Sequence, residues 1–345
     1  MTRPPQPALE AAMRRALELA AAPGVPAGPN PRVGCVLLAA DGSTVAEGHH
    51  RGAGTPHAEA DALATAGAAA RGTTAVVTLE PCAHTGRTGP CAQALVDAGV
   101  AHVVFAQDDP NPVAAGGADL LRAAGVGVES GLLAAESMAL NETWTFAVTH
   151  ARPFVTWKAA ATLDGRIAAA DGSSRWITSA PARAEVHDLR ASVDAVVVGT
   201  GTVLADDPHL AVRRDGEVVA GRQPLRVVVG LRDVPEGSRV LDDAAETLHL
   251  RTRDPLEVLA ALHGLEVQHV LLEGGPTLAA AFVRAGVVDA VRWYAAPALL
   301  GAGRNALDDA GMDSIGQALR LDVVDVARVG DDVRIDARVR RERGR

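Results

Sequence analysis

Hydrophobic and polar positions along this chain alternate between the spacing of helices and that of strands. In the first part, an amphipathic run over 8–22 predicts a helix, and apolar runs over 33–40 and 44–48 flank the pair Asp41-Gly42. Asp-Gly between two apolar runs is a strong signal for a β-hairpin. Later runs predict helices over 57–70, 91–98 and 132–147 and strands over 74–80 and 101–106.

The pattern breaks at 149–153 and then starts again. Apolar runs predict strands over 154–158, 195–199, 225–230, 267–272 and 287–294, helices near 180–190, 255–263 and 276–285, and a strand hairpin over 321–339. Strands that alternate with helices indicate α/β layers with helices on both faces of a sheet. We therefore predict an α/β protein with two domains, 1–150 and 151–345. The sheet of the second should be largely parallel with an antiparallel end.

Composition narrows the class of protein. A chain of 345 residues is long enough for about two domains. It is 48% hydrophobic but only 3% aromatic, so its cores should be aliphatic. Three cysteines do not make a disulfide framework. No apolar run reaches transmembrane length, and the start of the chain does not resemble a signal peptide. We expect a cytoplasmic enzyme that does not bind membranes, and the net charge of −9 argues against general nucleic-acid binding.

The first domain contains a candidate metal centre. It offers His57, Glu59, Cys82 and Cys91, each expected close to the start of a helix. One His and two Cys hold Zn²⁺ and leave a fourth position for water. His-x-Glu followed by Pro-Cys is typical of zinc deaminases, in which the Glu is a catalytic acid/base and not a ligand. The eight residues between Cys82 and Cys91 distinguish this chain from the nucleic-acid-editing members. The alternative reading is a solvated helix start with two buried thiols. The third cysteine, Cys35, lies in an apolar run and is expected in the core.

Two glycine turns follow strands in the second domain. Gly274-Gly275 precedes a predicted helix, and 199–202 follows another apolar run. Backbone amides at such turns suit the phosphates of a nucleotide cofactor, although a simple tight turn is an equally good interpretation. Neither turn is the G-x-G-x-x-G of a Rossmann fold. Arg190 and Arg213 are candidates for binding a substrate phosphate, or are surface charges.

Together these segments resemble the RibD family of bifunctional riboflavin-biosynthesis deaminase–reductases. In the first domain the resemblance rests on 30–34 (NPRVG), 48–49 (GH), 56–59 (PHAE), 81–91 (PCAHTGRTGPC) and 109–112 (DPNP). In the second it rests on Lys158, 163–166 (LDGR), 176–179 (WITS), 203–208 (VLADDP) and 273–275 (EGG). The resemblance covers nearly the whole chain. It implies a cytidine-deaminase-like α/β/α first domain and a dihydrofolate-reductase-like α/β second domain.

The resemblance also implies an activity and its residues. Zinc-dependent deamination of a diaminopyrimidinone that carries a phosphoribosylamino group would be followed by NADPH-dependent reduction of the ribosyl group to a ribityl chain. Expected partners are these small molecules and further copies of the chain in a homo-oligomer. Near the pyrimidine it places Asn30, His49 and His84. Near NADPH it places Ala160, Trp176, Thr202, Asp206, Gly275, Pro276, Thr277, Leu278, Ala279, Ala280 and Ala281. On the substrate of the reductase it places Lys158, Ser174, Arg190, Leu210, Arg213 and Glu273.

Two other classes of protein compete with this interpretation. A nucleic-acid deaminase would need a basic channel and stacking aromatic residues, and few aromatic residues occur in the first domain. A scaffold without activity would be expected to have lost a ligand or the acidic residue. His57, Glu59, Cys82 and Cys91 are all present.

Overall fold

The structure is a computed structural model that describes residues 3–25, 28–84 and 89–340. The chain divides into two compact units, residues 1–151 and 152–345, each with its own sheet and cores. Among the described residues, none of the helices is both long enough and apolar enough to cross a lipid bilayer.

The first unit is a sheet covered by helices on both faces. Its elements are α1 (Gln6–Ala20), β1 (Gly34–Leu38), β2 (Thr44–His49), α2 (Ala58–Ala66), β3 (Thr74–Leu79), α3 (Cys91–Asp97), β4 (His102–Gln107), α4 (Gly117–Ala123), β5 (Gly127–Ser130), α5 (Ala134–Leu140) and α6 (Glu142–His150). The strands lie in the order β2-β1-β3-β4-β5. β1 is antiparallel to both its neighbours, and β3, β4 and β5 are parallel.

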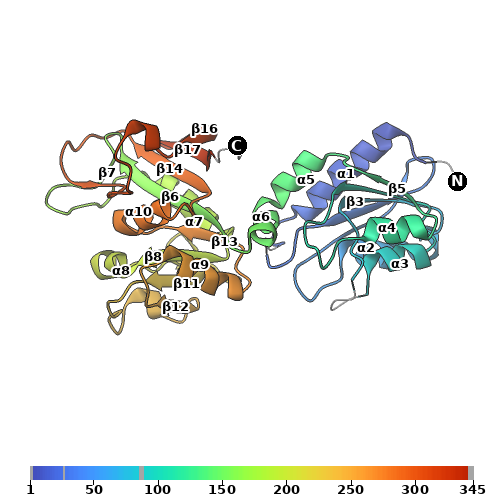
Figure 1. Ribbon diagram of the computed structural model, residues 1–345, viewed down its shortest axis with the longest axis horizontal. Coiled ribbons are helices and arrows are strands. Elements are labelled where there is room, and N and C mark those ends of the chain that lie inside the picture. Colours follow the sequence, from blue (N-terminus) through green and yellow to red (C-terminus); the bar gives the residue numbers. More distant parts are fainter. Residues whose placement is uncertain (1–2, 26–27, 85–88, 341–345) are drawn as a thin grey trace. The chain divides into compact units, whose positions relative to one another are not determined.

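Side chains that alternate along these strands build two cores. Cys35 and Leu37 of β1 pack with residues of α2, α3 and α4, whereas Val36 and Leu38 pack with α1. Figure 1 shows α1 and α5 on one face of the sheet and α2, α3 and α4 on the other. The expectation that Cys35 is a core residue is confirmed, because it is fully buried.

The predicted helix over 132–147 is wrong as one element, because it is divided at Asn141 into α5 and α6. The buried side chain of Asn141 accepts a hydrogen bond from the Arg32 backbone N–H (2.8 Å) and donates one to the Arg32 carbonyl (2.9 Å). An Asn that pairs with a distant backbone in this way competes with the helical hydrogen bonds. The sequence also gave no clear signal for α4 and β5.

The second unit is a larger sheet with an antiparallel end. Its main elements are β6 (Phe154–Thr162), β7 (Arg166–Ala168), α7 (Ala180–Ala191), β8 (Ala195–Gly199), α8 (Thr200–Asp206), β11 (Leu225–Val229), β12 (Thr247–Leu250), α9 (Pro255–Gly264), β13 (His269–Leu272), α10 (Pro276–Arg284), β14 (Ala290–Ala296), β16 (Leu321–Val329) and β17 (Asp332–Val339). Short strands β9 (Arg213–Arg214), β10 (Glu217–Val218) and β15 (Arg304–Asn305) complete two small ribbons. The main sheet has the order β12-β11-β8-β13-β6-β14-β17-β16.

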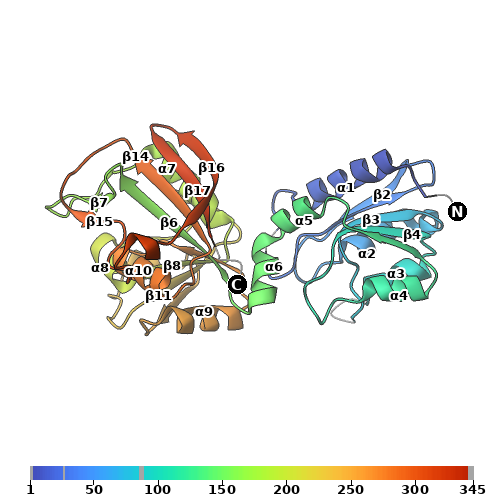
Figure 2. The same cartoon turned by 45° about the horizontal axis from the view of Figure 1, so that its top comes forward.

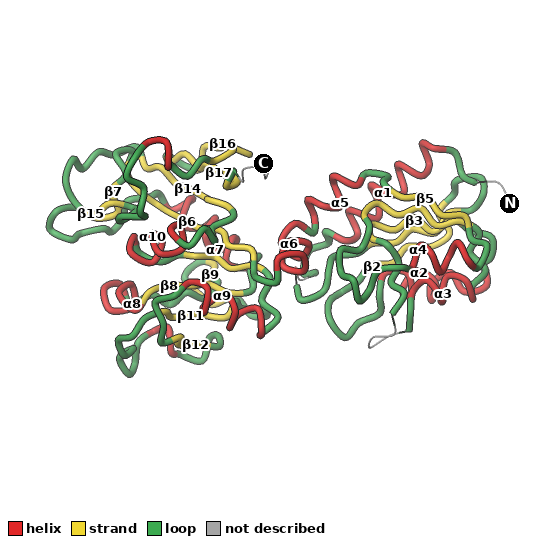
Figure 3. The backbone as a smooth tube through the Cα atoms, viewed as in Figure 1, coloured by secondary structure: helices red, strands yellow, loops and turns green. Residues whose placement is uncertain are grey.

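Helices cover both faces of this sheet as well. The first six strands in this order, from β12 to β14, are parallel to their neighbours. The hairpin β16–β17 is antiparallel and forms the other edge of the sheet. Residues of α9 and α10 share a core with one face, and residues of α7 and α8 pack on the other. Figure 2 shows β6 and β14 beside the β16–β17 hairpin, and Figure 3 distinguishes the strands of this unit from the helices and loops that connect them. The glycine turn expected at 199–202 is instead the start of helix α8, which follows directly from β8.

Candidate functional site

The candidate metal centre of the first unit is assembled by two helix starts and one strand end. His57 is the residue that precedes α2, and Cys91 is the first residue of α3. Cys82 lies in a loop that follows β3, so the expectation that it opens a helix is wrong. Its sulfur still gains from a helix start, because the backbone N–H of Cys91 donates a hydrogen bond to it at 3.4 Å. Residues 85–88, in the middle of the motif, lie outside the described residues.

The three predicted ligands come together. One donor atom from each of His57, Cys82 and Cys91 lies within 4.8 Å of the other two. Nδ1 of His57 is 3.2 Å from the Cys91 sulfur and 3.7 Å from the Cys82 sulfur. Two thiols and one imidazole at these separations match the open, three-ligand arrangement of a catalytic zinc site.

The protonation of the thiols also fits a cation. The hydrogen bond from the Cys91 thiol lowers the pKa of Cys82 to about 4. Burial opposes this change, and His57 contributes to it. The same bond raises the pKa of Cys91, since its proton is the one shared by the two sulfurs. Without a cation the pair therefore holds one thiolate and one thiol. A zinc ion replaces the remaining proton, because a coordinating thiol is deprotonated outright.

Glu59 lies beside this centre but outside the ligand triangle. It is in the first turn of α2, and only 3% of its surface is exposed. Burial raises the pKa of its carboxyl group to about 7, and the neighbouring Cys82 adds to this effect. A carboxyl group whose pKa is close to neutral can both take up and release a proton under physiological conditions, as a general acid/base must.

Of the two adjacent histidines, His50 lies against the candidate ligand His57 and Asn30, whereas the prediction named His49. The His50 ring lies edge-on to that of His57, with ring centres 5.4 Å apart, and its Nε2 is 3.0 Å from the Asn30 amide nitrogen. His49 is the last residue of β2, and its backbone N–H donates to Asp61. Nδ1 of His84 is buried without a hydrogen-bond partner among the described residues. His50 was missed because the sequence offers two adjacent histidines and no spacing rule to choose between them.

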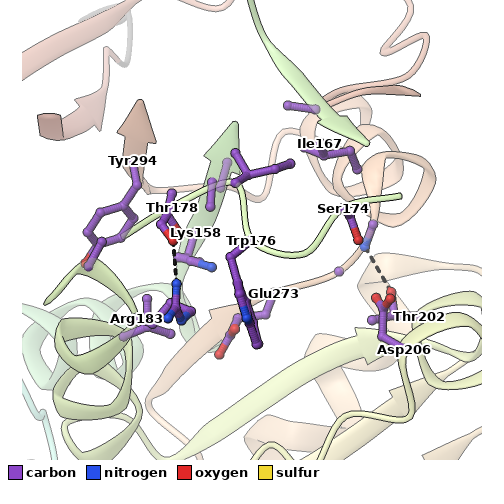
Figure 4. Close-up of a pocket in the computed structure, with 18 of the residues that line it drawn as sticks. Lys158, Ile167, Ser174, Trp176, Thr178, Arg183, Thr202, Asp206, Glu273 and Tyr294 are labelled. Atoms are coloured by element: carbon purple, nitrogen blue, oxygen red, sulfur yellow. Dashed lines mark hydrogen bonds between the residues drawn. The ribbon is translucent and has the colours of Figure 1, made fainter. Parts of the chain in front are cut away.

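A cavity of about 440 Å³ opens at the carboxyl ends of the parallel strands in the second unit. This is where open α/β sheets bind ligands. Predicted residues that line it are Lys158, Ala160, Ser174, Trp176, Arg190, Thr202, Asp206, Arg213, Glu273, Gly275 and Pro276. Tyr294, Arg183 and His187 also line it and were not predicted. In Figure 4 the ring of Trp176 lies between Arg183 and Asp206.

A charged trio occupies the base of this cavity. Nε of Arg190 lies 2.6 Å from one oxygen of Glu273, and its Nη2 lies 2.9 Å from the other. Burial by itself would raise the pKa of Glu273, but Arg190 and Lys158 together outweigh it and the pKa is lowered. Burial lowers the pKa of Lys158, which Glu273 partly counteracts. Glu273 therefore stays ionised, and Lys158 is a partly buried amine that releases its proton more easily than an exposed one.

The ring of Trp176 and the backbone at Gly275 line the same cavity. Trp176 is 69% exposed, and the Arg183 guanidinium lies 4.3 Å from the centre of its ring. The backbone N–H of Gly275 donates to the Thr202 hydroxyl at 3.3 Å. A Cβ atom placed on Gly275 would meet only that hydroxyl, at 3.5 Å. Space therefore remains at the start of α10 for a ligand to approach the backbone, as a phosphate-bearing cofactor requires.

Several predicted contact residues do not reach the cavity. Leu210 is 2% exposed and belongs to the core under α7 and α8. Ala279 and Ala280 lie on the buried side of α10, and Thr277 bonds to Asp308 at the surface. Leu278 and Ala281 also do not line the cavity. Of the predicted run 275–281, Gly275 and Pro276 line the cavity.

Comparison with known protein families matches both units. Residues 7–107 match the cytidine and deoxycytidylate deaminase zinc-binding region, and residues 153–335 match the RibD C-terminal domain. The first match contains His57, Cys82 and Cys91, and the second contains the cavity. The predicted α/β fold class, with a deaminase-like first part and a reductase-like second part, is confirmed.

Whole-chain relatives give the same result. The chain is 50% identical to the riboflavin biosynthesis protein RibD of Mycobacterium tuberculosis over 88% of its own length and 90% of that protein. It is 39% identical to RibD of Escherichia coli over 93% and 96% of the two chains. The solved structure of Acinetobacter baumannii RibD superposes with a TM-score of 0.88 and 38% identity, covering 97% of this chain and 99% of that one.

These similarities extend over both units and include the residues of the candidate metal centre and of the cavity. The resemblance seen in the sequence motifs is therefore confirmed. The chain belongs to the RibD family of riboflavin biosynthesis proteins.

Proposed function

We propose that this chain catalyses two successive steps of riboflavin biosynthesis. The first unit would deaminate 2,5-diamino-6-(5-phosphoribosylamino)pyrimidin-4(3H)-one, and the second would reduce 5-amino-6-(5-phosphoribosylamino)uracil with NADPH. A solved Thermotoga maritima protein whose name states these deaminase and reductase activities covers 96% of this chain at 34% identity, with a TM-score of 0.87. The observation that carries the proposal is the triangle of His57, Cys82 and Cys91 beside the buried carboxyl group of Glu59.

In the deaminase, His57, Cys82 and Cys91 hold the metal, which when bound supplies a water whose pKa is close to neutral. Glu59 would accept a proton from that water and deliver it to the ring nitrogen. It would then take the proton of the added hydroxyl group and deliver that one to the amine, which leaves as ammonia as the C–N bond breaks and the C=O bond forms. Glu59 suits this role because its carboxyl group is buried beside the three ligands and is not one of them. Asn30, fixed by His50, presents its amide oxygen to the pyrimidine.

In the reductase, Trp176 and the start of α10 at Gly275 are the surfaces for NADPH, which when bound supplies the hydride. Thr202, Asp206 and Ala160 complete this side of the cavity. Arg190 holds Glu273 in one orientation through two hydrogen bonds, so that Glu273 can accept from a sugar hydroxyl. Lys158 is placed to donate a proton to the sugar nitrogen or oxygen, because burial lowers its pKa. Arg213 and Ser174 face the remainder of the substrate.

We further propose that each activity resides in one unit, with the boundary near Ala151, and that the enzyme acts in the cytoplasm as a homo-oligomer. Small molecules, the pyrimidine and NADPH, are its partners. The division into units 1–151 and 152–345 supports the first point. The other points rest on the family, whose biosynthetic substrates are small metabolites.

The experiment that tests the function is an incubation of the purified chain with the diaminopyrimidine substrate. Without NADPH, mass spectrometry should show the product in which an amino group is replaced by oxygen, together with free ammonia. With NADPH, the reduced ribityl product should follow. Unchanged substrate in both reactions, from protein with a full zinc content, would refute the proposal.

A further inference from the structure

Arg226 is a fully buried arginine that lines neither site. It is the second residue of β11, and none of its side chain is exposed. Burying a guanidinium is costly unless it is paired and hydrogen-bonded. Both terminal nitrogens of Arg226 meet this requirement, because Nη1 lies 2.7 Å from a carboxylate oxygen of Asp242 and Nη2 donates to the carbonyls of Asp242 and Ala245, whereas its Nε has no partner among the described residues.

The same guanidinium also reaches a second segment of the chain. Its Nη1 lies 3.4 Å from the carbonyl oxygen of His209 and 3.4 Å from that of Arg239. Asp242, held by Arg226, pairs through its other oxygen with Nε2 of His209 at 2.6 Å. Arg226 therefore joins the segment around His209 to the segment 239–245, two loops far apart in sequence.

The segment 207–213 depends on such contacts for its shape. Asp207 and Leu210 have φ of 41° and 62°, the left-handed backbone that residues with a side chain adopt rarely. Leu210 turns its side chain into the core, and the Asp207 carboxylate accepts the backbone N–H of Arg239 at 2.8 Å. Arg239, which bonds to Asp207, also presents its carbonyl oxygen to Arg226, and Leu210 directly follows His209, which contacts both Arg226 and Asp242.

This segment ends at Arg213, whose side chain lines the cavity. Nε of Arg213 is buried and has no hydrogen-bond partner among the described residues. Burial lowers its pKa, and the nearby guanidinium groups of Arg239 and Arg190 lower it further. Because Glu273 is already bonded to Arg190, Arg213 is left as a cation that an anionic ligand would satisfy. A phosphate group is the anion for which arginine is best suited.

We propose that Arg226 is a positioning residue for substrate phosphate binding in the reductase: it locks the segment 207–213 so that Arg213 faces the cavity. The inference rests on the proposed function, since it assumes a phosphorylated substrate there. Arg226 touches neither substrate nor cofactor. Its loss should therefore weaken binding of the phosphate-bearing ligand and leave the chemical step and the cofactor largely unaffected.

The test compares Arg226→Lys with the wild-type chain in the NADPH-dependent reduction of the deaminated intermediate. A lysine side chain has a single nitrogen. It therefore cannot replace the bonds that the two terminal nitrogens of Arg226 make to both loops. We expect KM for the intermediate to rise by about 10-fold or more, the loss of one charge-assisted hydrogen bond, with kcat within about 3-fold. Inhibition by inorganic phosphate should weaken by a similar factor. The Kd of NADPH, measured by its fluorescence, should not change.

Asp242→Asn is the second variant, in case Arg226→Lys does not fold. This substitution keeps the size of the Asp242 side chain, which is 42% exposed, and removes the charge that pairs with both Arg226 and His209. Arg251→Lys is the matched control, because Arg251 forms an exposed pair with Asp233 and contacts neither loop. It should behave as wild type.

Three results separate the possible errors. If the wild-type chain binds neither NADPH nor the intermediate, the proposed function itself fails. If the wild type is active but Arg226→Lys and Asp242→Asn leave KM and phosphate inhibition unchanged, the inference about Arg226 is overturned. It is overturned equally if both variants weaken NADPH and intermediate to the same extent, since that outcome indicates general loosening of the unit.

Discussion

The amide of Asn30 donates a hydrogen bond to Nε2 of His50, and the other nitrogen of the same ring fixes its direction. The two atoms are 3.0 Å apart. Nδ1 of His50 lies 2.9 Å from the carbonyl oxygen of Pro56, which can only accept, so Nδ1 carries the hydrogen and Nε2 is the acceptor. Burial lowers the pKa of His50, which keeps the ring neutral. The Asn30 carbonyl oxygen is thereby the free acceptor of this side chain.

This relationship predicts a difference between two adjacent histidines. His50→Gln should leave Asn30 free to rotate and reduce kcat/KM for deamination by about 10-fold or more, the cost of one buried hydrogen bond. His49→Gln should have a much smaller effect, because only the backbone of His49 is bonded to Asp61. Steady-state ammonia release by both variants, at equal zinc content, measures the contrast. Equal losses in the two variants would contradict the assignment of His50.

The metal centre predicts which cysteines hold zinc. Cys82→Ser and Cys91→Ser should each lose most of the bound zinc, since each removes one of three protein ligands. Cys35→Ala is the control: Cys35 is equally buried but lies in the strand core, so its zinc content should stay near one ion per chain. Elemental analysis of the three purified variants tests this. Full zinc in both Ser variants would rule out the proposed ligand set.

The position of Glu59 beside the candidate metal ligands predicts that its substitution removes deaminase activity but not the bound zinc. Glu59→Gln keeps the size of the side chain and removes the proton-transferring group. Zinc content and fold should therefore remain, while deamination falls by a factor of roughly 10² to 10⁴. The reductase should still convert the deaminated intermediate at the wild-type rate, because its cavity is lined by residues of the second unit alone. A variant that releases ammonia normally would show that another group moves the proton.

The buried carboxyl group also predicts how the stability of the zinc-free protein depends on pH. The folded pKa of Glu59 is raised by burial from 4.5 to about 7. A raised pKa stabilises the fold fully below 4.5, and this contribution is lost as the pH rises through 7. Relative to Glu59→Gln, the zinc-free wild type should lose about 3 kcal/mol between pH 4.5 and pH 8. Thermal unfolding of both chains at pH 5 and pH 8 measures the change, and a pH-independent difference would contradict it.

Much of this architecture could be predicted because its signals are local. Pro56 and Pro90 lie directly before the helices that present His57 and Cys91: Pro56 precedes the capping residue of α2, and Pro90 is the capping residue of α3. Central parallel strands such as β8 and β11 contain runs of Val, a residue enriched in strands.

The remainder depends on contacts between distant residues, which no local pattern contains. Asn141 interrupts a helix because it bonds to Arg32, more than a hundred positions earlier. Cys82 does not begin a helix as predicted, but its sulfur accepts a hydrogen bond from the backbone N–H of Cys91, the first residue of α3. Leu210 matches the family pattern in sequence, yet its left-handed backbone turns it into the core and away from the cavity. For the same reason, the importance of Arg226 is visible only once its partners are placed around it.

The start of α10 predicts a steric test of cofactor binding. Gly275 has φ of −63°, which any residue can adopt, and a Cβ there meets only the Thr202 hydroxyl at 3.5 Å. Gly275→Val should therefore fold normally, but its side chain occupies the space where a phosphate must approach the backbone. We expect the Kd of NADPH to rise by about 10-fold or more, equivalent to about 1.4 kcal/mol. Deamination and zinc content should not change.

Thr277→Val is the matched control for this substitution. Thr277 lies on the same helix, bonds to Asp308 at the surface and does not line the cavity. If a phosphate of NADPH approaches the backbone at Gly275, Thr277→Val should bind NADPH with the wild-type Kd. The Kd of Gly275→Ala should then lie between those of the wild type and Gly275→Val. Fluorescence titration of NADPH against the three variants gives this order. Normal NADPH binding by Gly275→Val would indicate that the cofactor binds elsewhere in the cavity. Equal weakening in all three variants would indicate that the substitutions disturb helix α10 itself, and not the space beside Gly275.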